Sequence, residues 1–229
     1  MMQSLEQAVG PLDWRLPQTH AAYWAFAGRP HSEGFDRISL NRIIYQSLAD
    51  LYLNGRTVTA PGSRTVSDTM PDALPAAIRG FDLALGDFPG ERSFRGAHEN
   101  FLRQAILESY LLGQEDTSRE LYDRLRKTYA PEEPERGYEY VLYGSFLSRE
   151  DTLGPDQAAE AIDGLSRTAD GLRAIGDFDR AEACLRLQEI CRRQLRLHPP
   201  PELPPPSEEP PPAVPAGILE HTHHHHHHH

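Results

Sequence analysis

The spacing of apolar residues is the feature that most constrains how this chain folds. Over most of residues 36–197, apolar side chains recur at steps of three and four, the period of an amphipathic α-helix. Glycine and proline interrupt the pattern and mark the ends of successive helices. The sequence therefore predicts an all-α fold of about eight helices, stacked as antiparallel helical hairpins.

Capping residues and helix breakers give the expected boundaries. Pro17 is expected to open a helix that ends at Gly28, and Asp36 to cap a helix that ends near Asn54. Helical spacing is weaker over 72–86. The remaining helices are expected from Ser93 to Gly113, from Asp116 or Thr117 to Pro131, over 138–147, from Pro155 to Ile175 and from Asp177 to Leu197.

Two segments allow more than one structure. In residues 56–71, RTVTAPGSRTVSDTMP, two Thr/Val runs flank Pro61-Gly62, which is equally compatible with a small hairpin and with an irregular excursion. Residues 138–147 are expected to be helical, although Tyr140, Val141 and Tyr143 also favour a strand. Residues 1–198 form the expected helical body, with candidate sub-boundaries near 56–71 and 131–137.

The composition changes abruptly after residue 198. Ten of the 20 prolines lie in residues 199–215, so this segment is expected to be a disordered proline-rich tail with polyproline II character. It is interpreted as a spacer, with Pro-x-x-Pro docking motifs as the alternative. Residues 216–229, with eight histidines among the last nine positions, are interpreted as an expression tag and its joining residues.

Charge and cysteine usage narrow the classes of partner. The formal net charge is −11, and four glutamates lie beyond residue 198, which leaves −7 on the helical body. Nucleic acids and anionic membranes select for clustered cations, so neither is an expected partner. The chain lacks a run of about 18 apolar residues, so we expect no membrane insertion and a cytoplasmic location. Cys184 and Cys191 are expected to be buried thiols in a reducing compartment.

The sequence lacks the common motifs of nucleotide binding, metal binding and nucleophilic catalysis. It contains no GxGxxG, GxxxxGK[ST], HExxH, CxxC or GxSxG pattern, and His20, His31, His98 and His198 lie far apart. His98 is expected in the first turn of a helix, satisfied by solvent or backbone, and Ser145 is expected to bond back to the preceding turn. We therefore expect no catalytic residue, metal site or cofactor. An enzyme of unidentified class that assembles its site from distant residues is an alternative.

Two clusters of larger side chains have a structural and a binding interpretation. Core packing is favoured for the aromatic residues near the N-terminus over an exposed peptide-binding ridge. A solvated helix face is favoured for the strongest basic run over an anion site. The aromatic cluster consists of Trp14, Tyr23, Trp24 and Phe26, and the basic run of Arg186, Arg192, Arg193 and Arg196.

Two predicted helix pairs look alike: AILESYLLGQEDTSRELYDRLRKTYAP and SRTADGLRAIGDFDRAEACLRLQE. A glycine, a small residue five positions on and a large residue four further recur in both, as Gly176, Ala181 and Leu185 and, more loosely, as Gly113, Ser118 and Tyr122. This spacing resembles the tetratricopeptide-type helical hairpin. The two pairs lie 63 residues apart, against about 34 in that family, and lack its Trp, Leu-Gly and Tyr positions. The resemblance implies an irregular stack.

Stacked helix pairs expose a concave surface suited to holding a peptide or another protein. We therefore expect a non-enzymatic scaffold or binding domain with a protein or peptide partner. A groove lined by the first helix of each pair would include Arg103, Gln104, Leu172 and Arg173. The opening stretch GPLDWRLPQTHAAYWAFAG resembles a segment of large uncharacterised bacterial proteins with membrane helices upstream. That likeness implies an alternative, the soluble C-terminal part of a larger membrane-associated assembly component.

Overall fold

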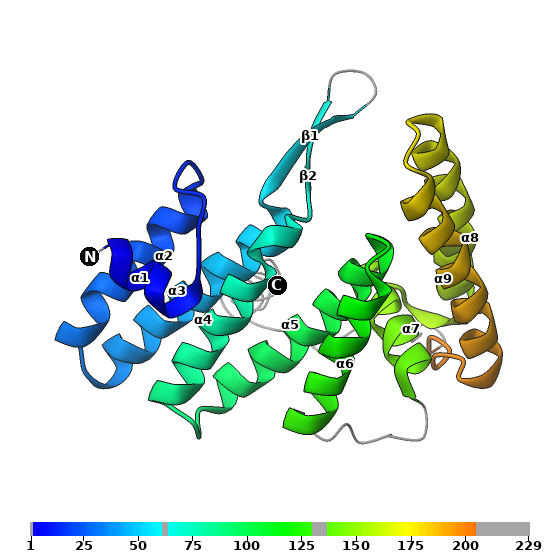
Figure 1. Cartoon of the computed structure of the whole chain (residues 1–229). Helices are drawn as coiled ribbons and strands as arrows, with labels where there is room; N and C mark the ends of the chain where they lie inside the picture. The colour runs from blue at the N-terminus through cyan, green and yellow to red at the C-terminus, as the bar shows by residue number, and fades with distance from the viewer. Residues whose placement is uncertain (1, 61–63, 130–136, 205–229) are drawn as a thin grey trace, which may run out of the picture.

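The computed structural model describes residues 2–60, 64–129 and 137–204, which are predominantly helical, as the sequence predicts (Figure 1). These residues contain nine α-helices, two 3-10 helices and two strands. The helices are α1 (Met2–Val9), α2 (Pro17–Gly28), α3 (Gly34–Asn54), α4 (Leu74–Asp87), α5 (Arg92–Leu111), α6 (Glu115–Tyr129), α7 (Gly137–Arg149), α8 (Gly154–Ala174) and α9 (Phe178–Leu197), with η1 (Arg29–His31) and η2 (Pro71–Ala73) between them.

A β-hairpin separates α3 from α4. Strand β1 (Arg56–Ala60) pairs antiparallel with β2 (Arg64–Asp68), and Val58 lies opposite Val66. The hairpin interpretation of residues 56–71 is therefore confirmed, while Pro61-Gly62 lies outside the described residues. Figure 1 shows the hairpin projecting away from the helices.

The helices lie side by side in a curved row that runs from α1 to α9 (Figure 1). Consecutive helices pack as pairs, notably α2 with α3, α5 with α6, and α8 with α9. Helix α5 is central, because it contacts α3, α4, α6, α7 and α9. Its side chains are consequently buried on several faces; Phe94, Phe101, Leu102, Ala105 and Ile106 are almost completely enclosed. Stacked hairpins are thus the observed architecture.

The two hairpins that look alike in sequence also turn alike. Gly113 and Gly176 both have φ of +81°, in the left-handed region that favours glycine. The amide of Gln114 donates to the Ser109 carbonyl at 2.9 Å, and that of Asp177 to the Leu172 carbonyl at 2.9 Å. This is the Schellman ending of a helix. The small residues Ser118 and Ala181 are fully buried where the second helix begins to pack.

Two expected helix caps are wrong. Asp36 lies in the first turn of α3, whose N-cap is Glu33, and Asp116 lies in the first turn of α6, which begins at Glu115. Acidic residues complement the helix dipole in the first turn as well as at the cap, so the two positions give similar sequence signals. The expected cap of α9 is confirmed, since Asp177 accepts a hydrogen bond from the Arg180 amide at 3.4 Å.

The aromatic segment after the 131–137 linker is helix α7. Tyr138, Val141, Leu142, Ser145 and Phe146 are its buried side, at steps of one, three and four. That burial pattern is helical, and the strand alternative for 138–147 is wrong. Residues 131–136 of this linker lie outside the described part of the chain.

The aromatic residues near the N-terminus divide between core and surface. Trp14, Tyr23 and Phe26 pack partly buried against the core, and the Trp14 Nε1 donates to Glu6 at 2.6 Å. Trp24 is 69% exposed. Core packing is therefore confirmed for three members of the cluster and wrong for Trp24.

Helix α9 buries its thiols and pairs most of its basic residues. Cys184 and Cys191 are free and buried, as expected, and burial raises the pKa of Cys191 to about 12. The arginine run lies on the outer side of the helix, where three of its members form ion pairs. These pairs are Arg186 with Glu182 at 3.1 Å, Arg192 with Asp163 at 3.1 Å and Arg193 with Glu139 at 2.9 Å.

Candidate functional site

A cavity of about 870 Å³ lies where α5 meets α7, bordered by the end of α3 and by β2. Three other cavities measure about 520 to 590 Å³. Helical spacing brings the lining residues together, with one stripe on α5 from Asn100 to Glu108 and one on α7 from Tyr140 to Arg149. This volume is within the range of small-molecule and peptide pockets.

The cavity exists because α7 turns small residues toward α5. Gly144, Ser145 and Ser148 lie on the lining stripe of α7, whereas its core side carries Tyr138, Leu142 and other large residues. A Cβ atom added at Gly144 would meet nothing within 4 Å. Small side chains thus leave open space between two helices that otherwise touch.

Ser145 lines the cavity and has a buried hydroxyl. The residue is 9% exposed, and its Oγ atom has no hydrogen-bond partner within the described residues. The expected bond back to the preceding turn is therefore not made, which corrects the sequence-based assignment. A buried polar group without a partner costs about 1–3 kcal/mol. A ligand that pairs with this hydroxyl would recover part of that free energy.

The acidic groups of the cavity are already paired with arginines. Arg180 contacts Asp68 at 3.3 Å, and Arg149 contacts Glu108 at 3.2 Å. Burial alone would lower the pKa of Arg149, but the Glu108 and Glu150 carboxylates raise it overall. Within the part of the chain that the structure describes, Arg103 by contrast forms a single, long ion pair, with Glu99 at 3.9 Å. Of the lining cations, Arg103 is the one best able to receive an added carboxylate.

Two of the four predicted partner-binding residues line this cavity. Arg103 and Gln104 face it from α5. Leu172 is partly buried against the core at the end of α8, and Arg173 is exposed next to it. Neither of these lines any of the four cavities.

Sequence reasoning missed the contributions of α7 and β2. The available signal was the recurrence of Gly144, Ser145 and Ser148 at helical spacing within an otherwise aromatic helix. The contribution of Ser67 and Asp68 of β2, and of Thr69 directly after it, gave no comparable sequence signal, because it depends on where the hairpin lies relative to the helices.

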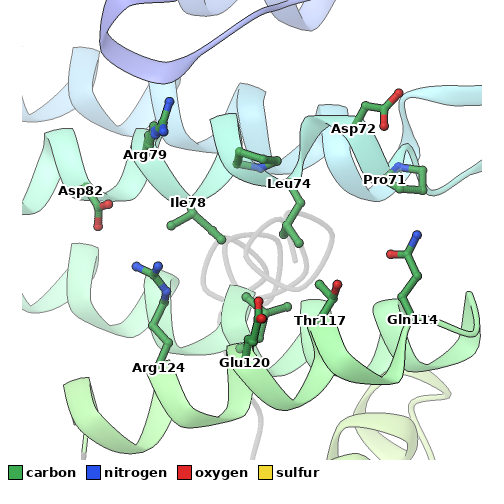
Figure 2. Close-up of a pocket in the computed structure, with 12 residues that line it drawn as sticks. Pro71, Asp72, Leu74, Ile78, Arg79, Asp82, Gln114, Thr117, Glu120 and Arg124 are labelled. Atoms are coloured by element: carbon green, nitrogen blue, oxygen red, sulfur yellow. The ribbon is translucent and has the colours of Figure 1, made fainter.

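A second groove runs between α4 and α6, with a volume of about 520 Å³. Leu74 and Ile78 of α4 and Leu121 of α6 give it an apolar side. Figure 2 shows Asp82 of α4 and Arg124 of α6 turned toward one another across the groove. The groove includes none of the predicted partner-binding residues.

His98 is a core residue. It is 2% exposed, and its Nδ1 atom lies 2.5 Å from the hydroxyl of Tyr129, while its ring stacks on Phe81 at 5.1 Å. Burial, with a smaller contribution from nearby arginines, lowers the pKa of His98 to about 4. The expected first-turn position is wrong, because α5 begins at Arg92 and its second turn faces Tyr129 of α6.

The histidines do not converge on a cavity. His20, His31 and His98 line none of the four cavities. Over residues 2–60, 64–129 and 137–204, no three His, Cys, Asp or Glu side chains gather as a metal site requires.

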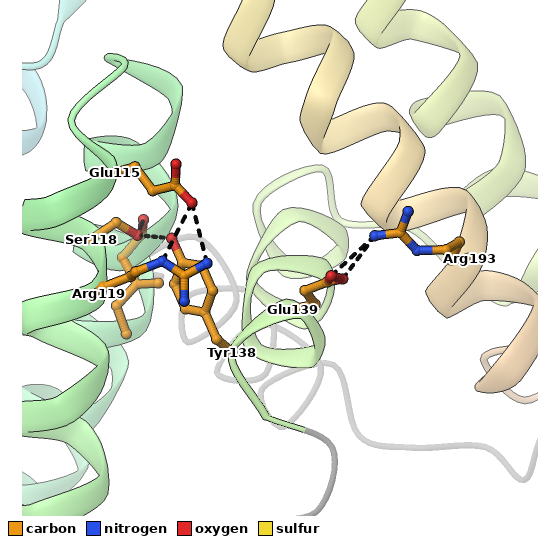
Figure 3. Close-up of polar contacts among 7 residues, drawn as sticks. Glu115, Ser118, Arg119, Tyr138, Glu139 and Arg193 are labelled. Carbon is orange, nitrogen blue, oxygen red and sulfur yellow. Dashed lines mark hydrogen bonds and ion pairs between the residues drawn. The ribbon is translucent and has the colours of Figure 1, made fainter.

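Polar contacts join α5, α6 and α7 (Figure 3). Ser118 of α6 donates to the Ile106 carbonyl of α5 at 2.6 Å and lies 2.7 Å from the Tyr138 hydroxyl of α7. The Arg119 guanidinium lies 4.4 Å from the ring centre of Tyr138, and burial raises the pKa of Tyr138 to about 12. These groups satisfy one another, so their role is to hold the helices in place.

Comparison with protein families, characterised proteins and solved structures found no match. Within the described residues, no helix combines the length and apolar character needed to cross a bilayer.

Proposed function

We propose that this protein is a non-enzymatic protein- or peptide-binding domain, and that the cavity between α5 and α7 is its binding site. The observation that carries the proposal is that Arg103, Gln104 and Ser145 line the same cavity, and that the buried Ser145 hydroxyl lacks a partner within the described residues. A cationic group and several amide and hydroxyl groups suit the polar surface of a polypeptide. The tetratricopeptide-like hairpin spacing in the sequence supports the same class of function.

The proposed partner is a protein or peptide, and the proposed location is the cytoplasm. The charge of −7 on the helical body disfavours nucleic acids and anionic membranes. Two free buried thiols are compatible with a reducing compartment.

The test begins with site-specific photo-crosslinking in cells of the source organism. A photoreactive phenylalanine replaces Gln104, which lines the cavity, or Gln46, an exposed glutamine on α3 that lines none of the four cavities. We expect one discrete crosslinked protein from position 104 and none from position 46. Equal crosslinking from both positions would contradict the proposed site.

The affinity for the crosslinked partner is then compared between two matched glycine variants. Gly144 and Gly171 both lie within helices, and an added Cβ meets nothing within 4 Å at either position. Gly144→Leu fills the cavity, whereas Gly171→Leu places the same side chain on the surface of α8. We expect at least tenfold weaker binding for Gly144→Leu only, measured by calorimetry. Unchanged affinity in both variants would reject the cavity as the binding site.

A further inference from the structure

The β-hairpin has free backbone edges. Within the described part of the chain the sheet contains only β1 and β2, so the outer N–H and C=O groups of each strand lack a strand partner. Such an edge is a ready template for an added strand. An isolated two-stranded hairpin is also only marginally stable in water, so an added strand would stabilise it.

The end of β2 is fixed beside the cavity. Ser67, Asp68 and Thr69 all line it. Asp68 is tied to Arg180 of α9 at 3.3 Å, and the Met70 amide donates to the Tyr52 carbonyl of α3 at 2.7 Å. These anchors hold the strand at one orientation to the cavity wall. A peptide paired with the free edge of β2 would therefore continue along that wall.

The opposite wall matches an extended polypeptide. Asn100 and Gln104, one turn apart on α5, present amides that both donate and accept hydrogen bonds, as a peptide backbone does. Ser145 on α7 adds its unpaired buried hydroxyl. Arg103 carries a positive charge that is weakly paired, whereas Asp68 and Glu108 are already bound by arginines. An acidic side chain of the peptide would therefore complement Arg103.

From these contacts we propose that an extended peptide segment of a partner protein binds as a third strand on β2 and places an acidic side chain against Arg103. This inference rests on the proposed function and specifies its binding mode. The main-chain bonds to β2 supply affinity, and the cavity selects the side chains.

The first test uses a phage-displayed library of random linear dodecapeptides, selected on the full chain. Selected peptides are synthesised with an N-methyl group at each backbone amide in turn. In strand pairing, only alternate amides face the neighbouring strand, so we expect binding to weaken about tenfold or more at every second position. Failure to select a peptide, or tolerance of N-methylation without a period of two, would overturn the proposal.

The second test separates the two edges of the hairpin. Thr57 and Ser67 are exposed register partners on β1 and β2, and the native thiols Cys184 and Cys191 are buried. Neighbouring strands lie about 4.8 Å apart, so a cysteine in the peptide reaches the adjacent strand but not the next one. We expect a disulfide with Ser67→Cys and none with Thr57→Cys. Preferential linkage to Thr57→Cys would overturn the proposed edge.

The charge contact is tested by a double-mutant cycle. Replacing the acidic residue of the peptide by its amide is expected to weaken binding to the wild-type protein about fivefold or more and to have little effect on Arg103→Gln. Independent, additive effects would remove Arg103 from the proposal. A partner that crosslinks at position 104 but binds through a folded surface would leave the proposed function intact and reject the strand-addition mode.

Discussion

His98 shows how strongly burial acts on a single residue. Its ring lies between Phe81 and Tyr129, where a positive charge would be poorly solvated, and the pKa falls from 6.5 to about 4. The folded protein therefore favours the neutral imidazole of His98. Because the Nε2 atom has no partner within the described residues, protonation has nothing nearby to compensate it.

This environment makes stability depend on pH. Between pH 6.5 and 4, the unfolded chain binds a proton at His98 that the folded chain excludes. The free energy of unfolding is therefore expected to fall as the pH falls through this window, by up to about 3 kcal/mol from this residue. Urea denaturation at a series of pH values measures the slope. In His98→Asn the slope should be shallower, and an unchanged slope would contradict the assignment.

Asp151 occupies a position that usually belongs to glycine. It ends α7 with φ of +52°, and the Thr152 amide donates to the Leu147 carbonyl at 3.3 Å, as in the turns at Gly113 and Gly176. A side chain in the left-handed region is strained, although Asp tolerates it better than most residues.

Asp151→Gly is therefore expected to raise the free energy of unfolding by about 0.5 kcal/mol, since relief of strain exceeds the added freedom of the unfolded chain. The reciprocal variant Gly176→Ala should lower it by about 1 kcal/mol, because open space surrounds Gly176 and only its backbone resists a side chain. Urea midpoints measure both changes. Equal signs for the two variants would contradict this account.

At the scale of elements, three helices meet at one serine. Ser118 of α6 bonds to the backbone of α5 and to Tyr138 of α7, so a small polar residue fixes the mutual positions of these helices (Figure 3). Ser109 is equally buried, but its hydroxyl bonds to the Ala105 carbonyl of its own helix at 2.6 Å. The two serines thus differ in whether they join elements.

Ser118→Ala is expected to lower the free energy of unfolding by about 2 kcal/mol, because the Ile106 carbonyl and the Tyr138 hydroxyl both lose a partner. Ser109→Ala, the matched control, should cost less than about 1 kcal/mol, since its bond is local. A double-mutant cycle with Tyr138→Phe measures the coupling by chemical denaturation. Equal losses for the two serine variants would argue against an inter-helix role for Ser118.

At the scale of the whole molecule, one ion pair connects parts of the chain that lie 112 residues apart. Arg180 of α9 binds Asp68 of β2, so the C-terminal helix pair and the projecting hairpin are linked. The side chains of both residues are largely buried, at 27% and 20% exposed. The position of β2 beside the cavity thus depends on a helix from the other end of the row.

Arg180→Ala is expected to accelerate amide hydrogen exchange in β1 and β2 while lowering the global free energy of unfolding by only about 1 kcal/mol. The hairpin responds more than the core, because it has few other contacts with the helices. Arg192→Ala, which removes an exposed pair between α9 and Asp163 of α8, should leave exchange in the hairpin unchanged. Uniform acceleration across all helices would instead indicate general destabilisation.

The local pattern of the sequence was sufficient for most of the helices, although it did not predict α1 and left the β-hairpin undecided. Pro17, Gly113 and Gly176 mark real helix ends, since each restricts the backbone by its own covalent structure. Arg103 and Gln104 line the cavity, whereas Leu172 and Arg173 do not, and whether any of the four binds a partner stays a prediction. The predicted caps of α3 and α6 lie two or three residues beyond the observed ones, because acidic residues suit the first turn as well as the cap.

What the sequence determined alone is the class of fold: helical periodicity, with glycine and proline at the breaks, allows only amphipathic helices that pack in pairs. Tertiary structure decided which faces meet. The lowered pKa of His98 results from burial against residues of other helices, and the cavity requires β2 beside α5 and α7. These properties depend on residues distant in the chain, because burial and electrostatic fields are set by packing rather than by local backbone preference.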